Sequence, residues 1–301
     1  MMDLTALFEL LDKHSIDYEK DAKTAALVSF KIGGIANLIV YPENIEELCF
    51  IINHLTNKNI KYFVLSLGTN TYFTDSKYEG VVISTIRINK IFIQDNYLIG
   101  ECGASLFKLC EIAKENSLSG LEFAYGIPGG VGGSVYMNAS AYEKSISEIV
   151  FASEVYDVIA NKIFSIDNRQ HFFGDKKSIF SERKIIVLKT KFKLVKSNKE
   201  IVSELMSQIL NSRLEKQPYQ KPSAGSAFKR PKNGYASKLI DQAGMKGMTV
   251  GGASISTTHA GFIINNGNAT ASDVNKLCKT IQKNIKENYN VELEKEIIFV
   301  E

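Results

Sequence analysis

One short segment of the chain sets a hydroxyl beside two cations. In "KPSAGSAFKRP", Ser226 stands among small residues, and Lys229 and Arg230 follow it just before Pro231. Two adjacent cations on a backbone restrained by proline suit a diphosphate, and the serine could give a proton to a group bound beside them. No His or Asp is near Ser226 in the sequence. The segment alone therefore leaves open an ordinary turn with a solvated basic corner.

A second segment is rich in glycine. The eight residues "GIPGGVGG", 126–133, hold five glycines and one proline. This content argues against a helix or a central strand, because Gly costs conformational entropy there and Pro has no N–H. The spacing matches neither of the two common phosphate loops, and no Lys follows before Lys144. The flanking "LEFAY" and "VYM" are apolar, unlike the surroundings of a flexible loop. We interpret the segment as a backbone cradle for an anion, with a long surface turn as the alternative.

A third segment, "VLSLGTN", reads as a strand that runs into the turn 66–70. Gly, Thr and Asn at the end of a strand can offer backbone N–H groups and a hydroxyl to a phosphate. An ordinary turn explains this piece equally well when it is taken alone. Two such turns in one half of the chain indicate a ligand with two phosphates, such as a dinucleotide, held between subdomains.

The elements that must position these segments can be predicted from periodicity. Leu4, Leu7, Phe8 and Leu11 have helical spacing. Asn44 and Glu47 form a capping pair for a second helix, and Ser105 is expected to cap a third. Strands are expected at the following segments: "NLIVYP", "KYFVL", "GVVIS", "YLIGE", "IVFASEVYDVIA" and "IIVLKTKFKLV". Lysines alternate with apolar residues in the last of these, as in a half-exposed antiparallel sheet.

The composition changes near residue 200. A helix near 201–214 lies between "KSNKE" and the two-proline segment "EKQPYQKPSAG", which marks a domain boundary. Thr270 and Asp273 are expected to cap a last helix, and the strand "EIIFV" follows it. Helices and strands alternate without a regular βαβ repeat, so the sequence predicts an α+β fold.

The composition, the net charge and the spacing of cysteines and histidines argue against several classes of protein. The chain has 301 residues, 45% of them hydrophobic and 23% charged, and a net charge of +3, which is too small to favour nucleic acid as a partner. No apolar run is long enough to span a membrane, and we expect a cytosolic protein. The four cysteines form no CxxC and the four histidines form no HxxxH, so we expect buried free thiols and no metal site.

Taken together, these segments resemble the UDP-N-acetylenolpyruvoylglucosamine reductase family, in its shorter class. The resemblance spans nearly the whole chain. It rests on "SFKIGGIANLIVYP", "LSLGTN", "GLEFAYGIPGGVGGSVYMNASAY", "KQP", "PSAGSAFKRP", "LIDQAGMKG", "GGASIS", "HAGFIINNGNATASDV" and "VELEKEI". The run 120–142 joined to the segment around Ser226 is highly specific.

The resemblance implies a flavoenzyme with a two-part FAD-binding unit of the vanillyl-alcohol-oxidase type and a C-terminal α+β substrate-binding domain. We expect FAD-binding subdomains at 1–90 and 91–198, a substrate domain at 199–290, and a strand at about 291–301 that returns near the active site. NADPH would reduce the flavin. The expected FAD-binding residues are Ser66, Leu67, Gly68, Thr69, Asn70, Gly126, Ile127, Pro128, Gly129, Gly132, Gly133 and Ser134.

The resemblance also implies the chemistry. Hydride from flavin N5 would reach C3 of the enolpyruvyl ether of the UDP-sugar, and Ser226 would protonate C2. Glu296 would help to polarise the substrate carboxylate. In "FFGDKKSIF", Lys176 occupies the place of the family's catalytic Arg, and Asp175 that of the preceding Tyr. Lysine keeps the charge but not the planar fork, and we hypothesise that Lys176 serves in its place.

Several assignments remain open beside these. Arg169 and Arg183 are weaker candidates for the catalytic cation. By motif and charge, Lys216, Lys229 and Arg230 are candidates for the substrate diphosphate. We interpret His259 as structural. Ser66 stands where the family often has Gly, and we expect this change to be tolerated.

Two other functions compete with a reductase. A related flavin oxidase would use oxygen, but such proteins commonly tether the flavin through a His in a glycine-rich turn, and no His lies near 66–70. A binding module without catalysis is conceivable because Lys176 replaces Arg. For the reductase we expect a small-molecule substrate, a monomer, and no nucleic-acid or membrane partner.

Overall fold

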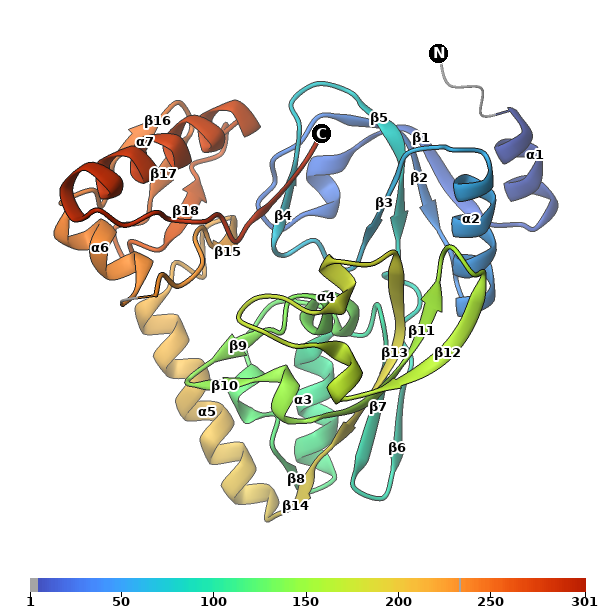
Figure 1. The fold of residues 1–301 in the computed structure, drawn as a ribbon. Coiled ribbons are helices and arrows are strands. Elements are labelled where there is room, and N and C mark those ends of the chain that lie inside the picture. The colour runs from blue at the N-terminus through green and yellow to red at the C-terminus, as the bar shows by residue number, and fades with distance from the viewer. Residues whose placement is uncertain (1–4, 233) are drawn as a thin grey trace. The chain divides into compact units, whose positions relative to one another are not determined.

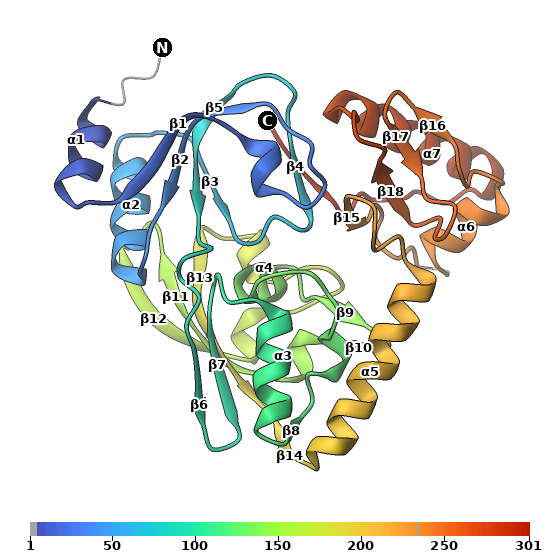
Figure 2. The same cartoon turned by 180° about the vertical axis from the view of Figure 1, so that it is seen from behind.

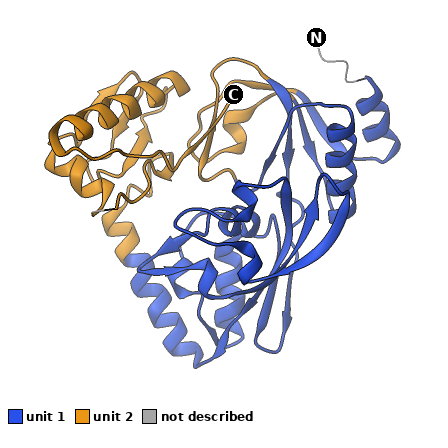
Figure 3. Ribbon diagram, in the orientation of Figure 1, with its two compact units in different colours: residues 1–20, 38–67, 79–211 blue, residues 21–37, 68–78, 212–301 orange. Residues whose placement is uncertain are grey.

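The computed structural model describes residues 5–232 and 234–301, so Leu4 of the first helical pattern lies outside the described residues. The chain folds into two compact units (Figure 3). Unit 1 consists of Met1–Lys20, Leu38–Leu67 and Glu79–Asn211, and unit 2 of Asp21–Asn37, Gly68–Tyr78 and Ser212–Glu301. Each unit draws on separate stretches of sequence. The predicted division at 1–90, 91–198 and 199–290 stays a prediction.

The helices and strands are labelled in Figures 1 and 2. The helices are Thr5–Lys13 (α1), Ile45–Asn57 (α2), Leu106–Glu115 (α3), Val131–Tyr136 (α4), Lys199–Lys216 (α5), Ala236–Gln242 (α6) and Ala271–Tyr289 (α7). A four-stranded sheet, mostly in unit 1, has the order Asp17–Lys23 (β1), Ile35–Tyr41 (β2), Tyr78–Ser84 (β5) and Tyr62–Leu65 (β3). The predicted strands and helices named above are found at these places and in the sheets below.

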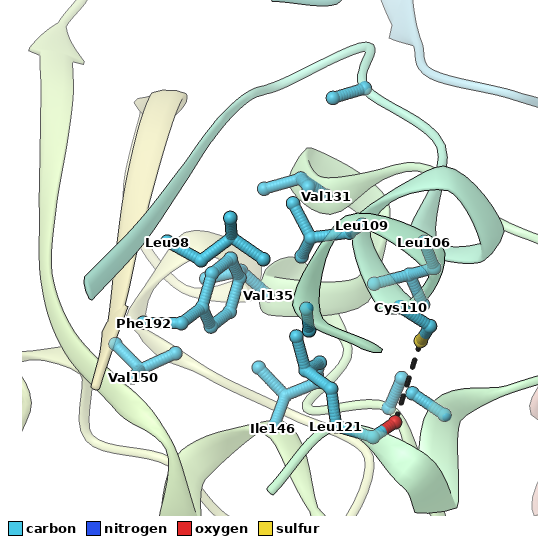
Figure 4. Packing of buried hydrophobic residues seen from close by; sticks show 14 of the residues in the cluster. Leu98, Leu106, Leu109, Cys110, Leu121, Val131, Val135, Ile146, Val150 and Phe192 are labelled. Carbon is cyan, nitrogen blue, oxygen red and sulfur yellow. Dashed lines mark hydrogen bonds between the residues drawn. The ribbon is translucent and has the colours of Figure 1, made fainter. Parts of the chain in front are cut away.

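A five-stranded sheet forms the centre of unit 1. Its order is Lys162–Asp167 (β12), Val150–Asp157 (β11), Ile185–Lys193 (β13), Tyr97–Glu101 (β7) and Ile91–Gln94 (β6). The β13 strand pairs antiparallel with both neighbours, and its lysines alternate with buried residues, as predicted. Helices α3 and α4 cover one face, where Leu109, Val131 and Val135 meet Leu98 and Phe192 (Figure 4). This core fixes the ends of the loops that run between α3 and α4.

Unit 2 has its own sheet and core. The sheet order is Ser223–Ser226 (β15), Phe262–Asn265 (β18), Ala253–Ile255 (β17) and Thr249–Val250 (β16). Ile240 of α6 and Leu277 of α7 are buried against it. The described residues also form three two-stranded sheets: Lys144–Ser145 (β10) with Ser140–Ala141 (β9), Val195–Lys196 (β14) with Leu118–Ser119 (β8), and Ile298–Val300 (β19) with Thr71–Phe73 (β4). The last pair is parallel and belongs to unit 2.

Two of the three predicted helix caps are made as expected. The Asn44 side chain accepts the Glu47 N–H at 2.9 Å, and Thr270 with Asp273 forms a complete capping box. Ser105 does lie at the N-cap position of α3, but its side chain makes no capping hydrogen bond there. A backbone bridge pairs Ser105 with Gly130 instead, so tertiary contacts hold this helix start.

The expectation that the glycine-rich segment contains no helix is wrong. Residues 131–136 form α4. The reason is packing: Val131 and Val135 are fully buried in the unit 1 core, which offsets the entropy that Gly132 and Gly133 lose.

Neither a membrane-spanning helix nor a group of metal ligands is found among the described residues. None of the helices in this part of the chain is both long enough and apolar enough to cross a membrane. Over 5–232 and 234–301, no three His, Cys, Asp or Glu side chains are grouped as metal ligands. The four cysteines are free thiols, and all but the half-buried Cys49 are buried.

Candidate active site

The glycine-rich segment is anchored in unit 1 by backbone hydrogen bonds. The Gly132 N–H donates to the Cys102 carbonyl at 2.8 Å, and the Val131 N–H donates to Ala104 at 2.8 Å. The Gly129 carbonyl accepts the Leu106 N–H at 2.9 Å. The segment is therefore held against the residues that link β7 to α3, and its role as a cradle for an anion stays a prediction.

The first part of the turn 66–70 lies against this cradle. The Ser66 hydroxyl donates to the same Cys102 carbonyl, at 3.0 Å. A Cβ added to Gly130 would lie 2.2 Å from the Ser66 Oγ, so the two segments are in direct contact within unit 1. The structure brings together Ser66 and the glycine-rich segment, as the prediction of one shared ligand requires.

The other residues of this turn belong to unit 2. Gly68 has a φ of +61°, and a Cβ there would lie 2.3 Å from the Leu27 carbonyl oxygen, so only glycine fits. Asn70 is tied at two points: its Nδ2 donates to the Glu296 carbonyl at 3.0 Å, and its carbonyl accepts the Ile298 N–H at 2.9 Å. Thr69 is half-buried. The division between the units falls between Leu67 and Gly68.

The residues present fit the diphosphate of FAD. Gly132 and Gly133 are half-buried, and a Cβ at Gly133 would have only the Ser66 Cβ, at 3.8 Å, within reach, so its backbone faces open space. Backbone without side chains is what a close approach of phosphate oxygens needs. Burial raises the pKa of the Cys102 thiol to about 12, so this nearby sulfur stays protonated and unreactive.

Ser226 is placed at the end of β15 by a bulge. The register shifts between the pairs Ser223↔Ile264 and Ser226↔Phe262, and Gly225 in this gap has a φ of +77°. The next residue is held on both sides: the Ala227 N–H donates to the Gly261 carbonyl at 2.8 Å, and its carbonyl accepts the Glu296 N–H at 2.9 Å. A bulge re-aims a side chain, and here the side chain is the Ser226 hydroxyl.

The same contacts bring Ser226 and Glu296 together within unit 2. The segment after Ser226 runs antiparallel to 294–296, with a bridge between Phe228 and Lys295. Both side chains are half-buried. Glu296 lies opposite Ala227, the residue after Ser226, so the backbone puts the two residues at neighbouring positions of one strand pair. Sequence reasoning could not find this pairing except through the family resemblance.

The cations expected at the substrate diphosphate have different surroundings. Lys229 pairs with Glu294 through its ammonium and through a backbone bond of 2.8 Å. The Arg230 guanidinium lies over the Tyr235 ring, 4.1 Å from its centroid, and its Nε donates to the Gly234 carbonyl at 3.3 Å, while the residue as a whole is exposed. Lys216 is exposed at the last position of α5. Arg230 thus has the pre-oriented planar fork that suits phosphate.

Lys176 lies in a tight turn of unit 1. The turn is closed by the Gly174 N–H, which donates to the Lys177 carbonyl at 3.0 Å, and Lys176 has a φ of +52°. The Asn138 side chain donates to the Gly174 carbonyl at 3.0 Å, and the Ser178 hydroxyl donates to Tyr136. These bonds dock the turn at the C-terminal end of α4. Asn138 and Ser178 therefore hold the turn that carries Lys176, and the sequence motifs did not single out either residue.

Two histidines, His171 and His259, hydrogen-bond nearby groups and have a lowered pKa because they are withdrawn from solvent. His171 is fully buried: its Nδ1 bonds the Asp167 carbonyl at 2.7 Å, and its Nε2 bonds the Ser153 hydroxyl at 2.8 Å. Burial lowers the pKa of His171 and of His259. The His259 Nδ1 accepts the Gly261 N–H at 3.1 Å, which is consistent with a structural role.

Arg169 and Arg183, the weaker candidates for the catalytic cation, are both exposed.

Two family models match separate parts of the chain. Residues 36–158 match an FAD binding domain, and residues 217–300 match the C-terminal domain of UDP-N-acetylenolpyruvoylglucosamine reductase. The first range includes the turn 66–70 and the glycine-rich segment. The second includes Ser226 and Glu296.

Relatives are similar over most of this chain. The UDP-N-acetylenolpyruvoylglucosamine reductase of Pseudothermotoga lettingae is 46% identical over 270 residues, which cover 89% of this chain and 93% of that protein. The protein of the same name from Caldicellulosiruptor saccharolyticus is 42% identical over 292 residues, which cover 96% and 94%.

Solved structures agree with the predicted fold. The UDP-N-acetylenolpyruvylglucosamine reductase of Thermus caldophilus has a TM-score of 0.80 at 30% identity, over 95% of this chain and 99% of that one. A glucooligosaccharide oxidase of Acremonium strictum has a TM-score of 0.51 at 11% identity, over 97% of this chain and 60% of that one, which concerns the fold alone. The α+β class with an FAD-binding unit of the vanillyl-alcohol-oxidase type is confirmed.

Proposed function

This chain belongs to the UDP-N-acetylenolpyruvoylglucosamine reductase family, and from that premise we propose that it reduces UDP-N-acetylglucosamine-enolpyruvate to UDP-N-acetylmuramate with NADPH as the electron source. The product is a precursor of peptidoglycan. The observation that supports the proposal is the backbone hydrogen bond from the Glu296 N–H to the Ala227 carbonyl, 2.9 Å, which joins the segments that carry Glu296 and Ser226.

Ser226 is the proposed proton donor. FAD, when bound and reduced, supplies the hydride that C3 of the enolpyruvyl group receives. Hydride addition leaves negative charge at C2 that is delocalised into the adjacent carboxylate, and C2 then needs a proton. The Ser226 hydroxyl, held by the Gly225 bulge, gives that proton. Glu296 hydrogen-bonds the substrate carboxylate and stabilises the developing charge.

Lys176 is the proposed cation for this charge. An ammonium group aimed at the carboxylate lowers the energy of the enolate, although it lacks the two parallel N–H bonds of an arginine. The tight turn 174–177 and the Asn138 bond limit how far the Lys176 backbone can shift. Lys216, Lys229 and Arg230 bind the UDP diphosphate, for which Lys229 must exchange its partner Glu294.

The turns 66–70 and 126–134 bind the FAD diphosphate. The support is their contact through Ser66 and the side-chain-free backbone at Gly132 and Gly133. We infer that the substrate is a small molecule, that the protein works as a cytoplasmic monomer, and that its partners include neither nucleic acid nor membrane.

An anaerobic redox cycle tests the function. Purified protein loaded with FAD should be yellow, should bleach with NADPH, and should regain its colour when the enolpyruvyl sugar is added without oxygen. Colour that returns only with oxygen indicates a flavin oxidase. Bleaching without any substrate-dependent return indicates a binding module. Protein that stays colourless with added FAD refutes the proposal.

A further inference from the structure

Two segments of unit 1 share one hydrogen-bond acceptor. The carbonyl of Cys102 accepts the Ser66 hydroxyl at 3.0 Å and the Gly132 N–H at 2.8 Å. A carbonyl oxygen has two lone pairs, so both are engaged. Ser66 belongs to the first turn and Gly132 to the glycine-rich segment, and neither bond lies within a helix or a strand pair. The two segments are thus joined at one buried residue that belongs to neither.

Gly130 shows that this contact is close. Its φ of −100° and ψ of 160° are extended values that any residue can adopt, so its backbone does not require glycine. A Cβ at Gly130 would lie 2.2 Å from the Ser66 Oγ, whereas its next neighbours, the Cys102 oxygen and the Leu67 Cγ, are at 3.3 Å. The Ser66 hydroxyl therefore fills the space that a side chain at position 130 would take.

We propose that Ser66 is a positioning residue that latches the two cofactor turns together, with Gly130 as its steric partner. The inference rests on the proposed role of these turns in binding the FAD diphosphate. A latch that is closed before the ligand arrives lowers the ordering cost of binding. Glycine at position 66 cannot make this bond. The expectation that Ser66 is tolerated in place of Gly stays a prediction, and the proposal adds a positioning role to it.

The first test is cofactor affinity. The flavin is removed from purified wild-type protein and variants, and FAD is titrated back while the quenching of flavin fluorescence is followed. Ser66→Ala should raise the Kd for FAD about fivefold, the loss expected for one side-chain hydrogen bond of about 1 kcal/mol. Ser207→Ala is the matched control, because the Ser207 hydroxyl also donates to a carbonyl of unit 1, Ser203, at 2.8 Å on the exposed side of α5.

The control should keep the wild-type Kd even if its stability falls slightly. A Kd for Ser66→Ala within twofold of wild type would overturn the latch. So would an equal rise in Ser207→Ala, since the effect would then follow general stability and not the contact between the turns.

The second test needs no cofactor. Gly130→Ala is made in the wild-type and in the Ser66→Gly background, and the thermal midpoint of the flavin-free protein is measured. In the wild-type background, Gly130→Ala should lower the thermal midpoint clearly, because its Cβ would lie 2.2 Å from the Ser66 Oγ. In the Ser66→Gly background this atom is absent, so the same substitution should lower the midpoint much less. Equal losses in both backgrounds would contradict the inference. If the wild type binds no FAD, the proposed function fails, yet this coupling still decides whether the two residues form a pair.

Discussion

Gly225→Ala tests how the proposed proton donor is held. Gly225 has a φ of +77°, and a Cβ there would have no heavy atom within 4 Å. The substitution therefore causes no overlap, and its cost comes from the left-handed backbone alone, about 1–2 kcal/mol. The strain is relieved only when the bulge relaxes, so we expect the chain to relax it in part and thereby to shift the Ser226 side chain. A shift of about 1 Å is enough to slow a positioned reaction about 10²-fold.

Gly244→Ala is the matched control for this prediction. Gly244 follows α6 in the same unit, has a φ of +66°, and also has no atom within 4 Å of an added Cβ. Both variants should lose about 1–2 kcal/mol in urea unfolding, because both force alanine into the same region.

Only Gly225→Ala should slow the chemistry. Under anaerobic conditions, the substrate-dependent return of flavin absorbance should fall about 10²-fold in Gly225→Ala, and it should stay near the wild-type rate in Gly244→Ala. Equal rates in the wild type and both variants would refute the claim that the bulge positions Ser226. An equal fall in rate in both variants would mean that the reduced stability of the folded protein, and not a shift of Ser226, slows the reaction.

Substitutions at three further positions test other parts of the account. Lys176→Ala should lower turnover about 10²-fold while Lys176→Arg retains it, as steady-state kinetics would show; near-wild-type turnover in the alanine variant would eliminate Lys176. Burial lowers the pKa of His171, so the unfolded chain binds protons at this residue that the folded protein does not. The urea midpoint of unfolding should therefore fall as the pH drops below about 6.5, and His171→Asn should make this pH dependence weaker. An unchanged pH dependence in the variant would exclude His171 as its source. Asp75 accepts the Ala271 N–H at 2.7 Å. Asp75→Ala should therefore lower the free energy of unfolding in urea by about 1–2 kcal/mol, and Asp75→Asn should lower it less. Equal free energies of unfolding in the wild type and Asp75→Ala would rule out this cap.

Local signals predicted local structure well. Asn44 with Glu47 and Thr270 with Asp273 are each three residues apart, which is the distance at which a side chain reaches the first turn of its own helix. The alternation of lysines predicted which face of β13 is less buried. The α+β class followed from the order of elements. Such features depend on neighbours in the chain, and the sequence contains them explicitly.

Contacts between distant residues could not be predicted in this way. Asp75 caps α7 across 196 positions, and Asn70 binds the Glu296 carbonyl across 226. The short helix α4 was missed because its two glycines oppose helix formation, while the burial of Val131 that favours it depends on the folded core. The turn that carries Lys176 is likewise fixed by Asn138, 36 residues before Gly174.

The proton step is tested most directly by Ser226→Ala in separate half-reactions, with Ser223→Ala on the same strand as control. Bleaching by NADPH should keep the wild-type rate in both variants. The anaerobic return of colour with the enolpyruvyl sugar should slow about 10²–10⁴-fold in Ser226→Ala alone, the contribution of a positioned general acid. Return at the wild-type rate without the Ser226 hydroxyl would contradict the assignment of this residue as the donor to C2.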